Sequence, residues 1–293
     1  MSLPGVFSDW IMPEKIHQLN VSFTVKTLRR EFGGTGGNCA YTLGLLGQKP
    51  VLVSILGRDA VAYQKHLLKA GVNLSGLRMD RGLSASGQVM TDKQDNQLWS
   101  YYPGPLRKLS AYSLEPIVKP HDLVALLPSE PKAFAKHLRE VVKRKARFMF
   151  DPAFFIPNLT QAELRLGLTY AEMIIGNDYE IALMENKVKR IIRHQLTKKQ
   201  VLIRTLGERG SEVYTGGMVH QIPAAKVKRV VDPTGAGDGY RSGFLTGYIE
   251  GKSMLDCGRM GAVAAAYTVE KYGTQTHHFT LQQFQERLRQ AYG

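Results

Sequence analysis

The residues best suited to chemistry lie in one short stretch, residues 232–238, with the sequence DPTGAGD. The valine-rich residues before it, 227–231, are expected to form a strand, and the amphipathic residues after it, which include Phe244 and Leu245, a helix. A glycine-rich turn between a strand and a helix aims backbone N–H groups and the positive end of the helix dipole at one point. The stretch therefore predicts a binding site for an anion such as phosphate.

Asp238 falls in the first turn of this expected helix, beside the anion site. A carboxylate there can accept the proton of an attacking hydroxyl, while the N–H groups of Gly235, Ala236 and Gly237 stabilise charge on a transferred phosphoryl group. Glycines and acidic residues are also ordinary at helix starts, so this interpretation depends on companion motifs.

Three further stretches could bind a ligand. Residues 33–38, GGTGGN, precede an expected helix over residues 39–46 and could cradle a ligand or simply make a tight connection. Asn177 and Glu180 follow an expected buried strand, where they could hold hydrated Mg²⁺ and phosphate, although their spacing also fits a helix capping box. Residues 205–210, TLGERG, end another expected strand and suit either a nucleotide-binding turn or a plain turn.

The elements that must position these residues alternate along the chain. Short apolar runs at residues 51–56, 123–127, 147–150, 173–175 and 201–203 indicate buried strands, and helical patterns at residues 60–70, 131–145 and after Thr160 fall between them. Such alternation predicts a parallel sheet covered on both faces, with ligands at the carboxyl ends of its strands. Residues 4–30 and 78–105 break the rhythm and are expected to form an exposed β lid on a single domain, residues 1–293.

Composition narrows the class of protein. The chain has 293 residues, 43% of them hydrophobic, with no run long enough for a membrane span and no secretion signal at its amino terminus, so we expect a cytoplasmic protein without a membrane partner. Its net charge of +14 makes nucleic acid worth weighing. No nucleic-acid-binding motif accompanies the charge, so solvated helix faces are the favoured explanation and attraction of phosphorylated ligands is another.

Together these residues resemble the ribokinase and phosphofructokinase-B (PfkB) family of carbohydrate kinases, within it the adenosine kinase-like or nucleoside kinase-like branch. The family's two signatures are matched by residues 33–38 and 232–238, and Asn177 and Glu180 match the NxxE motif between them. The resemblance implies a ribokinase-like three-layer α/β/α sandwich with a mainly parallel sheet and a small β-strand lid. It also implies transfer of the γ-phosphoryl group of ATP to a hydroxymethyl oxygen of a nucleoside or a sugar.

The resemblance implies that Asp238 is the base and that Gly235, Ala236 and Gly237 form the anion hole. It implies that Gly34 and Asn38 bind the acceptor and that Asn177 and Glu180 organise magnesium and phosphate. The implied nucleotide-binding residues are Thr205, Gly207, Gly210 and Gly273. Mg²⁺ is expected with ATP near Glu180 rather than in a site made by protein alone. The lid is expected to mediate a homodimer, and the need for a monovalent cation such as K⁺ is left open.

One departure from the family concerns the amino terminus. Members usually begin with a strand that carries a sugar-binding aspartate, and here that first strand is expected to be missing, because the chain starts at what looks like the lid. This motivates an alternative function, a catalytically weak sensor of nucleotides or sugars that keeps the kinase fold. The sequence does not choose among adenosine, other nucleosides and free sugars.

Overall fold

The computed structural model describes residues 1–94 and 96–293; residue 95, within the predicted lid segment 78–105, lies outside the described residues. At the centre is a six-stranded sheet in the order β10-β9-β8-β7-β6-β5. Strands β5 to β8 are parallel, and β9 and β10 add an antiparallel edge. These strands are β5 (Leu123–Leu126), β6 (Arg147–Phe150), β7 (Met173–Asn177), β8 (Val201–Thr205), β9 (Ser211–Thr215) and β10 (Met218–Ile222).

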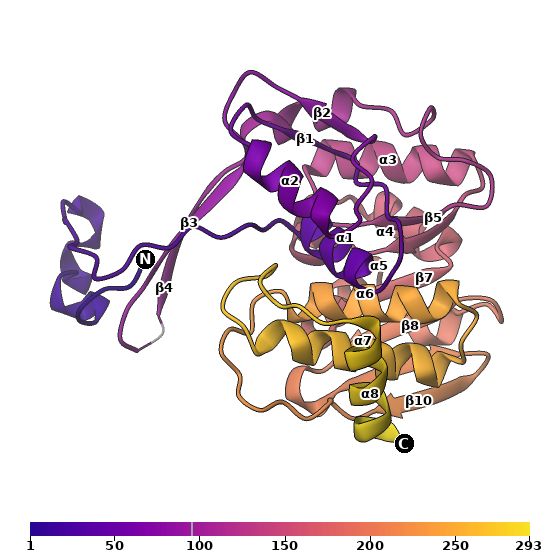
Figure 1. The fold of residues 1–293 in the computed structure, drawn as a ribbon. Coiled ribbons are helices and arrows are strands. Elements are labelled where there is room, and N and C mark those ends of the chain that lie inside the picture. The colour runs from indigo at the N-terminus through magenta and orange to yellow at the C-terminus, as the bar shows by residue number, and fades with distance from the viewer. Residues whose placement is uncertain (95) are drawn as a thin grey trace.

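Helices cover both faces of this sheet, as the parallel arrangement requires. They are α1 (Thr35–Leu45), α2 (Val61–Lys69), α3 (Pro131–Lys143), α4 (Gln161–Tyr170), α5 (Asp178–Val188), α6 (Ala236–Ile249), α7 (Met254–Val269) and α8 (Leu281–Tyr292). Met149 packs with α1, α6, α7 and α8, whereas its neighbours Phe148 and Phe150 pack with α3, α4 and α5. Side chains that alternate along β6 thus fill two separate cores, and the predicted mainly parallel, two-faced sheet is confirmed (Figure 1).

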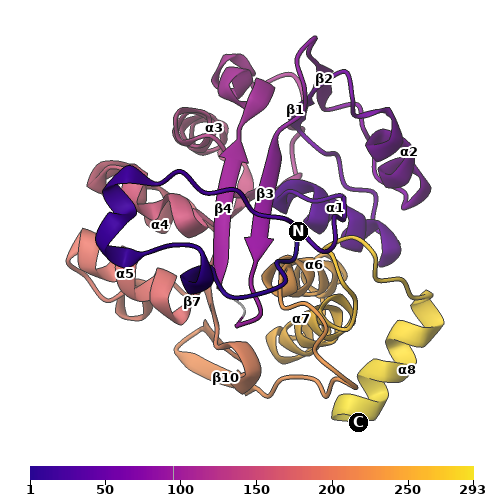
Figure 2. The same cartoon turned by 90° about the vertical axis from the view of Figure 1, so that its left-hand side faces the viewer.

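Two smaller pairs of strands lie outside the central sheet. Strands β1 (Ser54–Leu56) and β2 (Leu77–Met79) are parallel, and β3 (Ser86–Thr91) and β4 (Gln97–Tyr102) form an antiparallel hairpin. Residues 1–30 run beside this hairpin, and the two together extend from the body of the molecule (Figures 1 and 2). We call residues 1–30 and the β3–β4 hairpin the projecting layer.

Asp92 joins the two parts of the projecting layer. Its carboxylate accepts hydrogen bonds from the backbone N–H of Phe7, at 2.9 Å, and from those of Gln94 and Asn96 at the hairpin turn. The amino terminus of Met1 donates to the carbonyl oxygen of Val89 along the same edge. Residues 4–30 themselves contain two short 3₁₀ helices, Phe7–Asp9 and Pro13–Gln18, instead of the strands expected there.

Two other expectations about local structure are wrong. Residues 227–231 are irregular, because their N–H groups meet no neighbouring strand. Of these residues only Val231 donates its N–H to a backbone carbonyl oxygen, that of Val269, which also accepts from the N–H of the next residue, Asp232. Helix α1 begins at Thr35 instead of Cys39, so Gly36, Gly37 and Asn38 belong to its first turn. Both differences bear on the site described next.

Candidate active site

The turn at residues 232–238 is held by its own first side chain. Asp232 accepts from the N–H of Thr234 at 2.9 Å and from the N–H of Gly273 at 3.0 Å, which ties the turn to the loop after α7. Gly235 then takes a left-handed conformation, with φ of 81°, at the N-cap of α6. A Cβ on Gly235 would lie 2.9 Å from Cγ2 of Thr274, so this position needs glycine for its backbone and for close packing.

Asp238 stands in the first turn of α6, and each of its carboxylate oxygens faces a different partner. The side-chain amide of Asn38 donates to Oδ2 at 2.7 Å. Nη1 of Arg241, one turn further along α6, lies 3.5 Å from Oδ1. The carboxylate is therefore held in the first turn of α6, directly after the glycine turn.

The environment of Asp238 raises its pKa to about 6 from the ordinary 3.8. Burial is the main cause, because it disfavours the charged form; the Arg241 guanidinium and the Asn38 amide act in the opposite direction, and Asp151 adds to the rise. A carboxylate with a pKa near 6 is ionised at neutral pH, yet is a stronger base than a solvated aspartate. That combination suits a group that must take a proton from an alcohol.

Asn38 acts through Asp238 in this arrangement. Its Oδ1 accepts from Oγ1 of Thr274 at 2.8 Å and from Nε2 of Gln275 at 2.9 Å, which fixes the amide so that Nδ2 points at Asp238. Tyr63 donates to the carbonyl oxygen of Gly33 at 2.8 Å and so holds the chain that enters α1. The expectation that Asn38 binds the acceptor remains untested, whereas its contact with the base is seen directly.

Gly34 opens toward empty space at the N-cap of α1. Its φ is 89°, and a Cβ added there would meet no atom within 4 Å. The space beside its backbone borders Gly33, whose own Cβ would lie 3.7 Å from Oγ1 of Thr274. There is therefore open space beside Gly34, and acceptor binding there stays a prediction.

Asn177 and Glu180 form a reciprocal capping box at the start of α5. Oδ1 of Asn177 accepts from the N–H of Glu180, and Oε2 of Glu180 accepts from the N–H of Asn177, both at 2.8 Å. Burial raises the pKa of Glu180, and Asp151 and Arg241 also influence it, so this box lies within electrostatic reach of the Asp238 site. The capping box uses Oε2 of Glu180, and the role of Asn177 and Glu180 with magnesium and phosphate stays a prediction.

The turn at residues 205–210 lies next to this box. Thr205 pairs with Asn177 across strands β8 and β7, and Arg209 forms an ion pair with Asp178 at 2.9 Å. Gly207 and Gly210 both have positive φ, and a Cβ on Gly210 would lie 2.0 Å from the carbonyl oxygen of Ile222. Gly273, the fourth predicted nucleotide-binding residue, belongs to the loop bonded to Asp232 and so borders the Asp238 turn.

Four residues that the sequence did not single out as a site take part in it: Thr274, Gln275, Arg241 and Asp151. Arg241 follows Asp238 by three residues, and this helical spacing was a signal for a contact. The other three are brought in by the tertiary fold, from the loop after α7 and from the end of β6.

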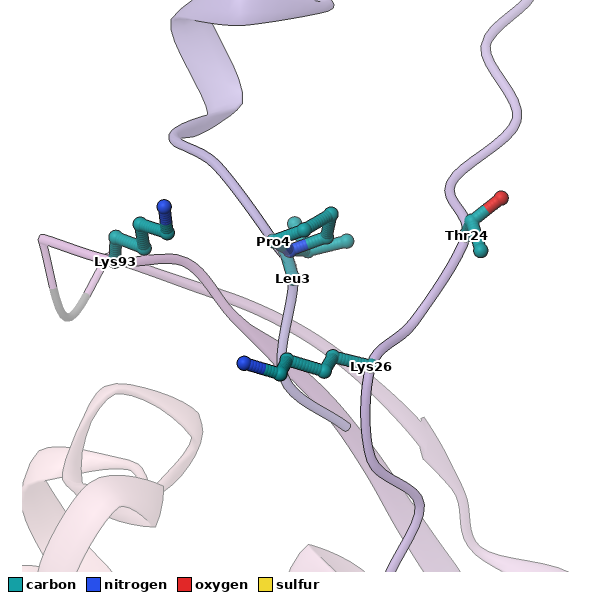
Figure 3. A pocket seen from close by; sticks show the side chains of 5 residues that line it. All are labelled: Leu3, Pro4, Thr24, Lys26 and Lys93. Carbon is teal, nitrogen blue, oxygen red and sulfur yellow. The ribbon is translucent and has the colours of Figure 1, made fainter.

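An open hollow of about 660 Å³ lies elsewhere, in the projecting layer. Leu3, Pro4, Thr24, Lys26 and Lys93 line it (Figure 3). None of these residues belongs to the set around Asp238, so we do not assign the hollow to the chemistry. Over residues 1–94 and 96–293, no group of three or more His, Cys, Asp and Glu side chains is arranged to hold a metal ion.

Comparison with known proteins identifies the family. The model of the pfkB family carbohydrate kinases matches residues 6–280. The chain belongs to the pfkB family. It is 29% identical to the nucleoside kinase of Methanocaldococcus jannaschii, with 94% of this chain and 91% of that protein covered, and 30% identical to the nucleoside kinase of Methanothermobacter thermautotrophicus, with 88% and 84% covered.

Solved structures agree with the sequence relatives. The nucleoside kinase of Burkholderia thailandensis in complex with inosine is 32% identical, with a TM-score of 0.88 over 100% of this chain and 94% of that one. The same protein in complex with ADP-inosine has a TM-score of 0.85, with 100% and 92% covered. The predicted ribokinase-like α/β/α fold is confirmed.

The predicted activity class is confirmed as well. This pfkB member is an ATP-dependent kinase that phosphorylates an alcohol group of a nucleoside or a sugar. The alternative of a catalytically weak sensor gains no support from these relatives. None of the helices in the described residues is both long enough and apolar enough to cross a membrane.

Proposed function

We propose that the acceptor is a nucleoside, phosphorylated on its 5′-hydroxymethyl oxygen, and that inosine is the first substrate to test. The observation that carries this proposal is the match over the whole chain to a nucleoside kinase solved with inosine, at 32% identity. The two archaeal relatives, of which this chain covers at least 84%, are nucleoside kinases too.

The geometry supports a mechanism with Asp238 as the base. Its carboxylate, with a pKa of about 6, would accept the proton of the hydroxymethyl group while that oxygen bonds to the γ-phosphorus and the bond from phosphorus to the ADP oxygen breaks. The N–H groups of Gly235 and Gly237 at the start of α6 would stabilise the charge on the migrating group, joined by that of Ala236, which here donates to the carbonyl oxygen of Pro233. Gly34 lies where it would approach an acceptor hydroxyl.

Mg²⁺ is the proposed companion of ATP. The capping box uses Oε2 of Glu180, so the other oxygen is available to a water molecule of a hydrated Mg²⁺, which prefers oxygen ligands and keeps several waters. When bound, the ion would neutralise charge on the β- and γ-phosphates. We propose that Thr205, Gly207, Gly210 and Gly273 line the nucleotide side, and that the reaction takes place in the cytoplasm, where ATP is supplied.

We further propose that the projecting layer closes over the acceptor as a lid of a single kinase domain and pairs with that of a second copy. Both sides of β4 are exposed, with Trp99 and Tyr101 at 61% and 63% of their full accessibility. Such aromatic side chains on an edge strand favour pairing with another chain. Size-exclusion chromatography with light scattering would report a dimer, and Trp99→Lys should shift it to monomer.

A substrate panel tests the proposed function. Purified protein is incubated with ATP, Mg²⁺ and either inosine, adenosine, guanosine, cytidine, ribose or fructose, with K⁺ or Na⁺ as the monovalent cation, and products are resolved by mass. We expect kcat/KM for inosine to exceed that for ribose by at least about 10²-fold, since a site that hydrogen-bonds a base rejects a sugar without one. Preference for a free sugar would refute the nucleoside assignment while leaving the kinase class intact.

A further inference from the structure

Arg241 is the most buried cation at the site, and it lies between two carboxylates. Its side chain is 11% exposed, its Nε donates to Oδ2 of Asp151, and its Nη1 lies 3.5 Å from Oδ1 of Asp238. Asp151 follows directly after β6 and its side chain is fully buried. A guanidinium presents its donors in a rigid fork, so fixing one edge on Asp151 fixes the direction of the other.

The two oxygens of Asp238 therefore have separate supports. Asn38 holds Oδ2 from α1, and Arg241 faces Oδ1 from the next turn of α6. We propose that Arg241, anchored by Asp151, is a positioning residue that aims the Asp238 carboxylate at the acceptor hydroxyl and sets its charge balance.

The same guanidinium also lies against the anion turn. A Cβ on Gly237 would be 2.6 Å from Nη1 of Arg241, so the glycine is required there by the arginine. The positive charge of Arg241 is thus packed against the backbone that would receive the phosphoryl group, and this places one cation next to both the base and the anion site.

The Asp151 carboxylate anchors Arg241 through Oδ2, and the nearby backbone N–H of Ala153 also favours its charged form. In the described part of the chain its Oδ1 is buried without a hydrogen-bond partner, whereas buried carboxylates kept for structure are normally bonded at both oxygens. Burial raises the pKa of Asp151 and Arg241 lowers it, so the ionised form depends on the arginine. The pair is neutral as a unit, which lets it support Asp238 without adding a net charge to the interior.

Charged and titratable groups face Asp238 from four elements. They are Arg241 on α6, Cys39 on α1, Asp151 after β6 and, further away, Glu180 on α5, whose own pKa Asp151 and Arg241 influence. Burial keeps the Cys39 thiol neutral by raising its pKa. Arg241 lowers the pKa of Asp238 and Asp151 raises it, so removing one or the other should move this pKa in opposite directions. Because the effect of Arg241 is the larger, removing both should leave a smaller rise.

The experiment compares Arg241→Gln, Asp151→Asn and the double variant with the wild-type protein, using pH profiles of kcat/KM. An opposite charge within about 4–6 Å is worth about 1–3 pKa units, so Arg241→Gln should move the acid limb up by about one unit or more. Asp151→Asn should move it down, and the double variant should move it up by less than Arg241→Gln does. Values of kcat should fall in all three, with KM for ATP changed less than about threefold, since the pair touches the base.

The double variant also guards against misfolding, because it removes both charges of the Arg241–Asp151 pair and leaves Asp238 its hydrogen bond from Asn38. Arg147→Gln is the matched control: it breaks the ion pair with Glu172, 2.8 Å long, at the opposite end of β6 from Asp151. This control should lower the melting temperature without moving the acid limb. Unmoved acid limbs in Arg241→Gln and Asp151→Asn, or limbs displaced in the same direction, would overturn the proposal and leave the pair a structural ion pair.

The inference rests on the proposed role of Asp238 as base, so a second readout needs no turnover. Carbon-detected NMR of aspartate carboxyl groups, with Asp238→Asn used for assignment, follows the titration of Asp238 in each variant. If the wild-type protein phosphorylated no nucleoside while these titrations moved as expected, the proposed substrate would fail and the positioning pair would stand. Titrations that do not differ among the variants would reject the pair.

Discussion

Replacement of Asp238 by asparagine should remove activity and change the pH dependence of stability at the same time. The carboxylate has a pKa of about 6 in the folded chain against 3.8 ordinarily. Between these values the folded protein holds a proton that the unfolded chain has released, so folding is favoured at the acid end and this contribution is lost as pH rises toward 6. The difference of roughly 2 units corresponds to about 3 kcal/mol.

Urea unfolding of the two proteins at intervals from pH 4 to pH 7.5 measures this effect. The free energy of unfolding of the wild type, minus that of Asp238→Asn, should fall by roughly 2.5 kcal/mol between pH 4 and pH 7 and then stay constant. Taking the difference cancels the groups that the two proteins share. Turnover of the variant should fall by about 10²–10⁴-fold, because a general base has been lost.

The wild-type rate should follow the same ionisation. One unit below its pKa about a tenth of Asp238 is ionised, so kcat/KM at pH 5 should be about a tenth of its plateau. If the two stability curves ran parallel, burial would not be raising the pKa of Asp238. If the variant kept wild-type turnover, Asp238 would not be the base, whatever its pKa.

Three other perturbations test neighbouring parts of the site and the projecting layer. Gly235→Ala should lower both the melting temperature and kcat, because it adds a Cβ 2.9 Å from Thr274 to a strained backbone. The control Gly251→Ala has a similar φ of 71° but no atom within 4 Å of the added Cβ, so it should show only a strain cost of about 1–2 kcal/mol and normal kcat. Equal effects on kcat would exclude the Thr274 contact as the cause. Glu180→Gln should raise KM for Mg-ATP or lower kcat by about tenfold. The melting temperature should stay the same, since burial already disfavours the charge of Glu180. Glu163→Gln, in the equivalent capping box of α4, is the control that should keep normal kinetics. Asp92→Asn should speed limited proteolysis of residues 1–30, and proteolysis unchanged by the substitution would contradict this. In the wild type, Asn96 and backbone N–H groups overcome the effect of burial and hold the pKa of Asp92 at about 2. The contribution of Asp92 to holding the projecting layer together should therefore be present above about pH 4 and lost as pH falls toward 2.

The local sequence predicted the central elements, because the pattern of apolar residues within each segment indicates which residues are buried. Residues 147–150 were expected to be a strand and are β6, and the capping box of Thr160 and Glu163 was expected and is present. The strand expected at residues 227–231 failed although it is rich in valine. Val230 and Val231 are exposed, and no adjacent strand takes up the hydrogen bonds, so β propensity had no partner to act on.

The candidate site was predictable in its parts and unpredictable in its connections. Asp238 and the glycine turn carry their signal in seven consecutive residues, whereas two of the residues that set the chemistry of Asp238, Asp151 and Asn38, lie 87 and 200 positions away in the chain. Asn38 reaches it because the glycine-rich stretch is the first turn of α1 and not a loop before it, and α1 packs directly on α6. Helical geometry therefore makes residues 33–38 relevant to the base.

The glycines of the two signatures follow from this packing. Gly37 lies against the hydroxyl of Tyr63, Gly235 against Thr274, and Gly237 against Arg241, each so closely that a Cβ would collide with the neighbouring side chain. A glycine-rich turn at a phosphate site is usually explained by the ligand's approach to the backbone. Here the protein's own side chains fill the space on the far side of the backbone, so the same glycines let the base and its supports sit within hydrogen-bond distance before any ligand binds.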